Sequence, residues 1–118
     1  MSESDPPLVC DLSKLTVSER QRLEAVVAEL FPSANEVRAL PYGYALGYLE
    51  ASADTISKMA EFIAYDRLCC GFLTHALVSE PLEGITWLRI TGGDGAKEVI
   101  AADVKRLVSP NAVIVSDL

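Results

Sequence analysis

Helical and strand-like periodicities alternate along this chain, and their order constrains the fold more than any other feature. Apolar residues recur at helical spacing over 17–31, 55–69 and 96–108. Between these stretches lie two pairs of short strand-like segments, each pair joined by a turn that contains proline and glycine. Hairpins with segregated helices are typical of an α+β domain with an antiparallel sheet. The sequence therefore predicts an antiparallel sheet built from two β-hairpins, with about three helices packed on it.

Local signals mark where the expected helices begin and end. Thr16 and the glutamate three positions later match a capping box for the first helix. Ser52 or Asp54 caps the second helix, and Gly71 is expected to end it in the left-handed conformation. Trp87, in an expected strand, is interpreted as packing against a helix. The expected strands are 36–40, 44–49, 72–79 and 85–91, with a closing strand at 112–115.

The stretch 92–95, Gly-Gly-Asp-Gly, precedes the third expected helix and superficially resembles a phosphate-binding loop. Its spacing fits neither standard glycine fingerprint, and no Lys-Ser/Thr pair follows it. Asp94 stands where a helix cap belongs. We therefore interpret this stretch as the cap of the third helix rather than as a phosphate site.

Length and composition indicate a single domain. The chain has 118 residues, near the common domain size, and half of them are hydrophobic. Residues 1–7 are polar and contain proline, which predicts a flexible tail ahead of one α+β domain over 8–118. No run of about 18 apolar residues occurs, and the acidic start lacks the regions of a signal peptide. We therefore expect a cytoplasmic protein.

The charge balance argues against polyanionic partners. The formal net charge is −7, from 17 acidic against 10 basic residues, and the basic residues form no cluster. Such a surface repels nucleic acid and anionic lipid. We expect neither nucleic acid nor a membrane as a partner.

Three cysteines carry the most distinctive chemistry. Cys69 and Cys70 are adjacent at a helix–strand junction, and Cys10 lies far upstream. An odd number cannot all pair within one chain, and cytosolic thiols are normally kept reduced. Adjacent residues hold their Cα atoms about 3.8 Å apart, below the usual disulfide range of roughly 4.4–6.8 Å. We therefore expect free thiols rather than a structural disulfide.

Free thiols at this position favour a soft ion. A helix C-terminus disfavours thiolates, as does a neighbouring thiolate, unless Arg67 or a metal compensates. Thiolates prefer soft ions. If Cys10 folds back beside Cys69 and Cys70, three sulfurs suit arsenite or mercuric ion better than zinc, whose structural sites usually have four ligands. His75, the only histidine, is the candidate fourth ligand. The alternative is that the cysteines are small buried hydrophobic residues and that His75 is an ordinary core or surface residue.

Two acidic residues of the second expected helix, Glu61 and Asp66, precede the cysteine pair closely enough to orient a base or to bind an ion. Acidic residues on a helix more commonly mark its solvated face. Both interpretations stay open from the sequence.

The segments around the cysteines also resemble a family of small uncharacterised bacterial proteins. That family carries an Arg-x-Cys-Cys-Pro-Phe-Leu core, a Trp-Leu-Arg-Leu-Thr-Gly strand and a Gly-Val-Lys-Glu helix start. The resemblance implies thiol or heavy-metal handling through Cys10, Cys69 and Cys70. Gly71 replaces the proline of the family core, which loosens the turn after the pair. The matching stretches are 10–12, 36–38, 66–74, 87–92 and 95–98.

Three functions from different classes follow. The leading hypothesis is binding of a soft metal or metalloid ion, of mercury or arsenic type, for sequestration or sensing, with Cys10, Cys69, Cys70 and His75 as ligands. The second is a thiol-dependent redox enzyme or transferase, in which one cysteine attacks and another resolves. The third is a non-catalytic homodimeric interaction module. The sequence indicates no cofactor other than a soft ion.

Overall fold

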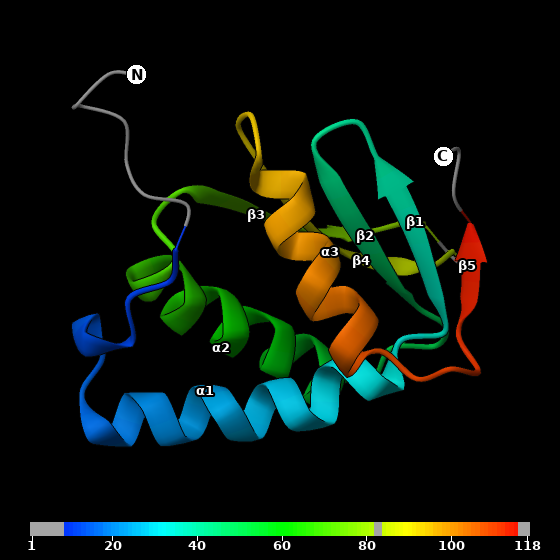
Figure 1. Ribbon diagram of the computed structural model, residues 1–118. Coiled ribbons are helices and arrows are strands. Elements are labelled where there is room, and N and C mark those ends of the chain that lie inside the picture. The colour runs from blue at the N-terminus through cyan, green and yellow to red at the C-terminus, as the bar shows by residue number, and fades with distance from the viewer. Residues whose placement is uncertain (1–8, 82–83, 116–118) are drawn as a thin grey trace.

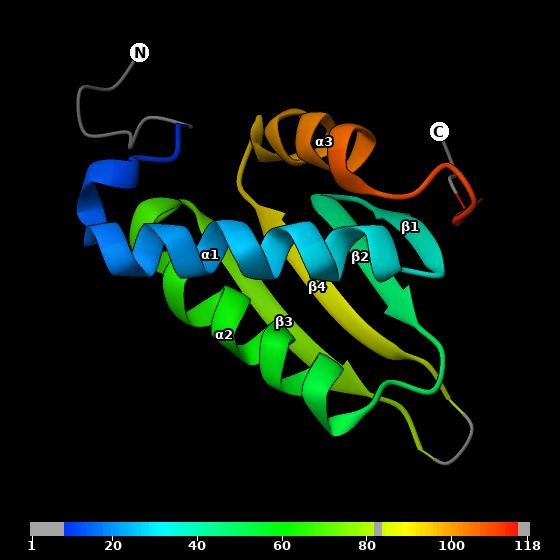
Figure 2. The same ribbon diagram turned by 90° about the horizontal axis from the view of Figure 1, so that it is seen from below.

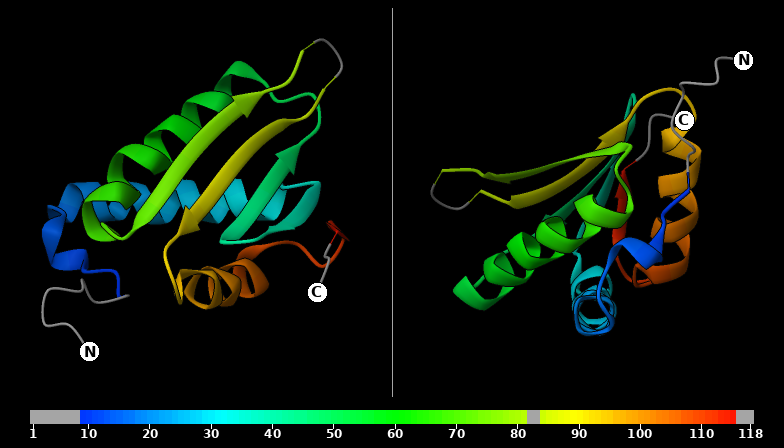
Figure 3. Two further views of the ribbon diagram at one scale, coloured as in Figure 1. Left: turned by 90° about the horizontal axis from the view of Figure 1, so that it is seen from above. Right: turned by 90° about the vertical axis from the view of Figure 1, so that its left-hand side faces the viewer.

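The computed structural model of the protein describes residues 9–81 and 84–115, and the tail predicted over 1–7 lies outside them. In these ranges a five-stranded sheet carries three α-helices on one face (Figures 1 and 3). No helix in this part of the chain is long and apolar enough to cross a membrane. In chain order the elements are η1 (Leu12–Lys14), α1 (Val17–Leu30), η2 (Phe31–Ser33), β1 (Glu36–Leu40), β2 (Gly43–Tyr48), α2 (Ala53–Cys69), β3 (Leu73–Ser79), β4 (Thr86–Gly92), α3 (Ala96–Leu107) and β5 (Val113–Val115).

Both predicted hairpins are confirmed, and they share one sheet. β1 pairs with β2 and β3 with β4, all antiparallel, and an antiparallel β2–β4 pairing joins the hairpins in the order β3-β4-β2-β1-β5. β5 instead runs parallel to β1, so the sheet is mixed and the prediction of a purely antiparallel sheet is wrong at this edge. The reason is the connection. α3 carries the chain back along the sheet, so β5 runs in the direction of β4, as a crossover connection requires.

The core lies between the sheet and the helices. Leu46 of β2, Leu88 of β4 and Met59 of α2 have no exposed surface. The hydroxyl of Tyr48 donates to the Leu30 carbonyl at 2.8 Å. Residues two apart in a strand lie on the same face, so Leu46 and Tyr48 both face the helices.

Trp87 lies on the opposite, helix-free face, so the interpretation that it packs against a helix is wrong. The period of two in β4 assigns Trp87 and the core residue Leu88 to different faces. Gly47 stands opposite Trp87 in the ladder, and a Cβ on that glycine would lie 2.8 Å from the indole ring. The guanidinium of Arg38 lies 4.8 Å from the ring centroid, and the indole nitrogen donates to Glu80 at 2.8 Å.

The helix caps follow the sequence in part. The capping box at Thr16 is confirmed, and Ser52 rather than Asp54 caps α2. Asp94 was expected to cap α3, but Gly95 takes the cap position with φ 86° and no side chain caps the helix. Glycine adopts this left-handed conformation without steric cost. α2 ends where predicted, although Gly71 is not left-handed.

Candidate functional site

The N-terminal segment folds back onto the end of α2 and brings the three cysteines together. α2 ends at Cys69, and Cys70 is its C-cap residue. The backbone N–H of Asp11 donates to the Cys69 carbonyl at 2.7 Å, which fixes the upstream segment against the helix end. Cys10 and Cys70 form a disulfide with a Cα–Cα distance of 4.3 Å. The condition that Cys10 folds back beside the pair is therefore met.

The disulfide corrects the expectation of three free thiols. Cys10 and Cys70 are bonded across a sequence separation of 60, and Cys69 is a buried thiol. The short Cα spacing of adjacent residues disfavours a Cys69–Cys70 bridge but does not restrict Cys10, which pairs with Cys70 instead. Cys69 and Cys70 are not bonded to each other, as their spacing predicts.

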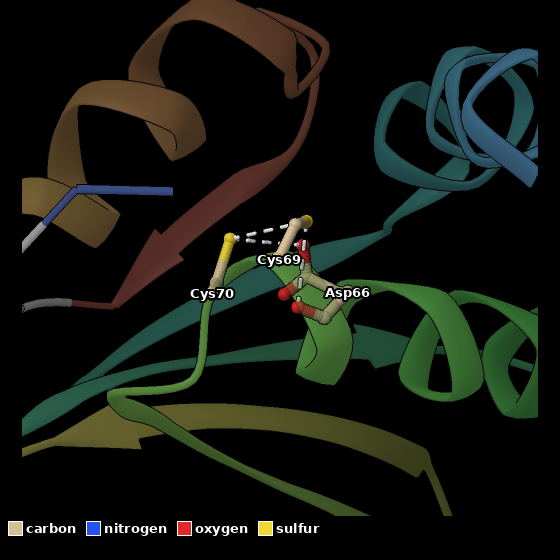
Figure 4. Close-up of side chains that lie close together, drawn as sticks. All are labelled: Asp66, Cys69 and Cys70. Atoms are coloured by element: carbon tan, nitrogen blue, oxygen red, sulfur yellow. Dashed lines mark hydrogen bonds between the residues drawn. The ribbon is translucent and has the colours of Figure 1, made fainter. Parts of the chain in front are cut away.

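Cys69, Cys70 and Asp66 form a compact group of ligand atoms. The Sγ atoms of Cys69 and Cys70 lie 3.7 Å apart, and Asp66 Oδ1 lies 3.5 Å from Cys70 Sγ (Figure 4). One ligand atom from each of the three residues lies within 4.8 Å of the others. Their spacing of three and four residues places them about one helical turn apart. This group of two sulfurs and a carboxylate can hold a metal ion once the Cys70 sulfur is free.

His75 lies behind this group rather than within it. Its Nε2 is 2.6 Å from Asp66 Oδ2, and its side chain is 3% exposed. The ring packs edge-on against Phe62 with a centroid distance of 5.6 Å. The structure therefore places His75 beside Asp66, where it orients the carboxylate, and not beside the sulfurs. Glu61 pairs with Arg22 of α1.

The Cys69 thiol is not activated. Burial raises the pKa of this thiol, and the negative charge of Asp66 raises it further. Arg67, the compensating cation considered from the sequence, is exposed to solvent. A thiol in such surroundings is largely protonated at neutral pH and is a poor nucleophile.

The cysteines line an open cavity of about 400 Å³ between α1 and α3. Figure 2 shows α1 lying between the other two helices on the covered side of the sheet. Apolar side chains make up most of the cavity wall, and Asp66 and all three cysteines contribute to it. Sequence reasoning missed this cavity because its wall combines residues from separate helices and strands. Members of the apolar wall include Leu23, Val27, Phe31, Leu73, Ile100 and Leu107.

Comparisons of the chain with protein-family models, with curated proteins and with solved structures find no match. The resemblance to a bacterial family stays a prediction, as does the cytoplasmic location. The chemistry of the site itself therefore carries the functional argument.

Proposed function

We propose that the reduced protein binds a soft metal or metalloid ion of arsenic or mercury type through Cys10, Cys69 and Cys70. The observation that carries the proposal is the convergence of three sulfurs from two distant segments at one place beside a carboxylate. The disulfide form is then the closed state of the site. Two small thiols open it by exchange, leaving as a disulfide while Cys10 and Cys70 each gain a hydrogen.

The spacing of the sulfurs supports shared coordination. As a reference, two thiolates about 2.3 Å from a tetrahedral zinc ion lie about 3.8 Å apart, a separation at which two sulfurs share one ion. The observed distance between Cys69 Sγ and Cys70 Sγ is 3.7 Å. The Cys10 sulfur is held against Cys70 by the disulfide and starts from an adjacent position after reduction. After reduction the three sulfurs are therefore neighbours at the end of α2.

The surroundings favour a soft ion over a hard one. Thiolates select soft ions, whereas carboxylate-rich sites suit calcium and magnesium. Asp66 is the single carboxylate of the group, and His75 already engages one of its oxygens. Deprotonation of buried thiols is unfavourable until a cation is bound, so binding of mercuric ion releases protons and strengthens with pH. Arsenous acid instead takes up the thiol protons in the water that leaves the arsenic. Sequestration or sensing fits a group that holds an ion without an activated nucleophile.

The redox alternative has one observation in its favour. The Cys69 thiol lies 3.7 Å from the Cys70 sulfur of the disulfide, within reach of attack, although the product would be the adjacent Cys69–Cys70 bridge that the Cα spacing disfavours. Its raised pKa opposes this at neutral pH, because the thiolate is the attacking species. The homodimeric module stays a prediction.

Binding is tested by titrating the phosphine-reduced protein with arsenite and with mercuric chloride while sulfur-to-metal absorbance is followed in the ultraviolet. We expect one equivalent to bind and to protect all three thiols from alkylation. Cys69→Ser should weaken arsenite binding at least tenfold, because one of three sulfur ligands is lost. The oxidised protein, in which Cys69 is the one free thiol, is the matched control and should not bind arsenite.

Two outcomes contradict the proposal. One is alkylation of all three thiols at the same rate with and without the ion. The other is an arsenite affinity that is the same in wild type and Cys69→Ser. The pH profile of Cys69 alkylation separates the redox enzyme, since a thiol pKa well below ~8.5 would favour catalysis.

A further inference from the structure

The cavity beside the cysteines is much larger than a bare ion requires. Its volume of about 400 Å³ lies in the range of small-molecule sites, roughly 300–1,000 Å³. Most of its wall offers carbon rather than ligand atoms. An ion held by three sulfurs would use only part of this space. The apolar remainder is available to an organic group attached to that ion.

We infer that the site takes monosubstituted organic compounds of trivalent arsenic, whose single apolar group occupies the cavity while two cysteine sulfurs bind the arsenic. The inference rests on the proposed function and specifies its substrate class. In the binding step R–As(OH)₂ and two thiols give R–As(S–Cys)₂ and two waters. Two As–O bonds and two S–H bonds break, two As–S bonds and two O–H bonds form, and no electron is transferred.

The placement of the sulfurs gives the organic group its direction. The three cysteines meet at the C-terminal end of α2, whereas α1 and α3 supply much of the remaining cavity wall. Trivalent arsenic makes three bonds, so an arsenic atom held by two sulfurs directs its third substituent away from them. Val27 of α1 and Ile100 of α3 belong to the surface that such a substituent meets.

The wall selects an apolar substituent. Charged side chains at the cavity are few, and two of them, Asp103 and Arg106, are exposed and bonded to each other at 3.1 Å. Burying a phenyl-sized group stabilises a complex by an amount that corresponds to about ten- to hundredfold in affinity. A methyl group on the same arsenic atom gains only a small part of this. The ratio of the affinities for the phenyl and methyl compounds therefore measures the contribution of the apolar cavity, separately from that of the sulfur–arsenic bonds.

The test compares phenylarsonous acid with methylarsonous acid on the full-length, phosphine-reduced protein, with dithiothreitol as the competing dithiol. Competition cancels the intrinsic difference in thiol affinity of the two arsenicals. We expect the protein to prefer the phenyl compound by at least tenfold relative to dithiothreitol. We also expect Cys69→Ser to keep most of its affinity for phenylarsonous acid, because Cys10 and Cys70 suffice, while its arsenite affinity falls at least tenfold.

Two variants of α1 form a matched pair. Ala28 is exposed and lines the cavity, whereas Ala25 is exposed on the same helix and does not line it. Ala28→Phe should reduce the phenyl-to-methyl preference to within about threefold of unity by filling the space, and Ala25→Phe should leave it unchanged. Circular dichroism of both variants checks that the fold is retained.

The outcomes separate the two proposals. A wild-type preference near unity, or one that Ala28→Phe leaves intact, overturns the inference while arsenite binding still supports the proposed function. Failure of both arsenite and the organic arsenicals to protect the thiols overturns the proposed function and the inference together.

Discussion

The Cys10–Cys70 disulfide should be a major source of stability for this domain, and its removal is the most direct test of the structure. The bond closes a loop between residues 60 positions apart. In the chain-entropy model a crosslink of this span removes about 4 kcal/mol of conformational freedom from the unfolded chain. Measured losses for native disulfides are about 2–5 kcal/mol. Total stability is typically about 5–15 kcal/mol, so the loss is a large share.

The perturbation is Cys10→Ser, and Cys69→Ser is its matched control, because Cys69 is buried beside the disulfide without belonging to it. Urea unfolding followed by circular dichroism should show a loss of about 2–4 kcal/mol for Cys10→Ser, with a steeper urea dependence because the unfolded chain exposes more surface without its crosslink. The control should lose about 1 kcal/mol or less and keep the wild-type slope. Thiol counting in denaturant should find one thiol in the oxidised wild type and three after reduction.

Two results would refute this reasoning. If Cys10→Ser unfolds within about 0.5 kcal/mol of the oxidised wild type and with the same slope, the crosslink does not restrict the unfolded chain as calculated. If Cys69→Ser is as destabilised as Cys10→Ser, the loss reflects disturbed packing at the end of α2 rather than the opened loop.

Two further predictions concern pH and the sheet. Folding raises the pKa values of Cys69 and Tyr48, so the unfolded chain releases these protons at lower pH than the folded protein does. The free energy of unfolding is therefore unaffected by these groups below about pH 8.5. It falls as the pH rises from there through the pKa of the folded Cys69 thiol. The urea midpoint should fall less with rising pH in Cys69→Ser than in the wild type. Tyr48→Phe should remove the part of the fall in the midpoint that begins near pH ~10. The same dependence of the midpoint on pH in all three proteins would contradict the assignment. Gly43→Ala should cost about 2–3 kcal/mol or more in urea unfolding, because the added Cβ would meet the Ile90 carbonyl oxygen of β4. Gly93→Ala, where a Cβ meets nothing within 4 Å, should change stability by about 0.5 kcal/mol or less, and similar losses in the two would be inconsistent with the close approach at Gly43.

The sequence predicted those parts of the fold that depend on local pattern. Alternation and turn chemistry located both hairpins, and the capping box at Thr16 is present as expected. The direction of β5 could not be obtained this way, because it depends on how α3 returns the chain to the sheet. The face occupied by Trp87 depends likewise on pairing, which places it opposite Gly47 on the helix-free side.

In the candidate site, too, only the features set by local spacing could be predicted from the sequence. The adjacent cysteines and Asp66 share one helix end, so their proximity could be inferred from helical spacing. The disulfide could not be predicted, because it depends on where the segment that carries Cys10 lies. Contacts such as the backbone hydrogen bond from Asp11 to Cys69 determine that position. The link from His75 to Asp66 joins β3 to α2, and nothing in the local sequence indicates it. Chemistry-bearing residue types were visible in the sequence, whereas their bonding partners depended on tertiary structure.

The disulfide and the proposed ion site use the same sulfurs, and this overlap links binding to redox state. Cys10 and Cys70 cannot be bonded to each other and ligate an ion at the same time, so an ion that binds only the reduced form favours reduction by mass action. Opening the disulfide releases the loop of 60 residues, but an ion bridging Cys10 and Cys70 closes the same loop again. The stabilising crosslink is then transferred from the sulfur–sulfur bond to the ion. In a reducing compartment, where disulfides are commonly transient or redox-sensing, the bound ion would thereby determine whether the N-terminal segment stays attached to the end of α2.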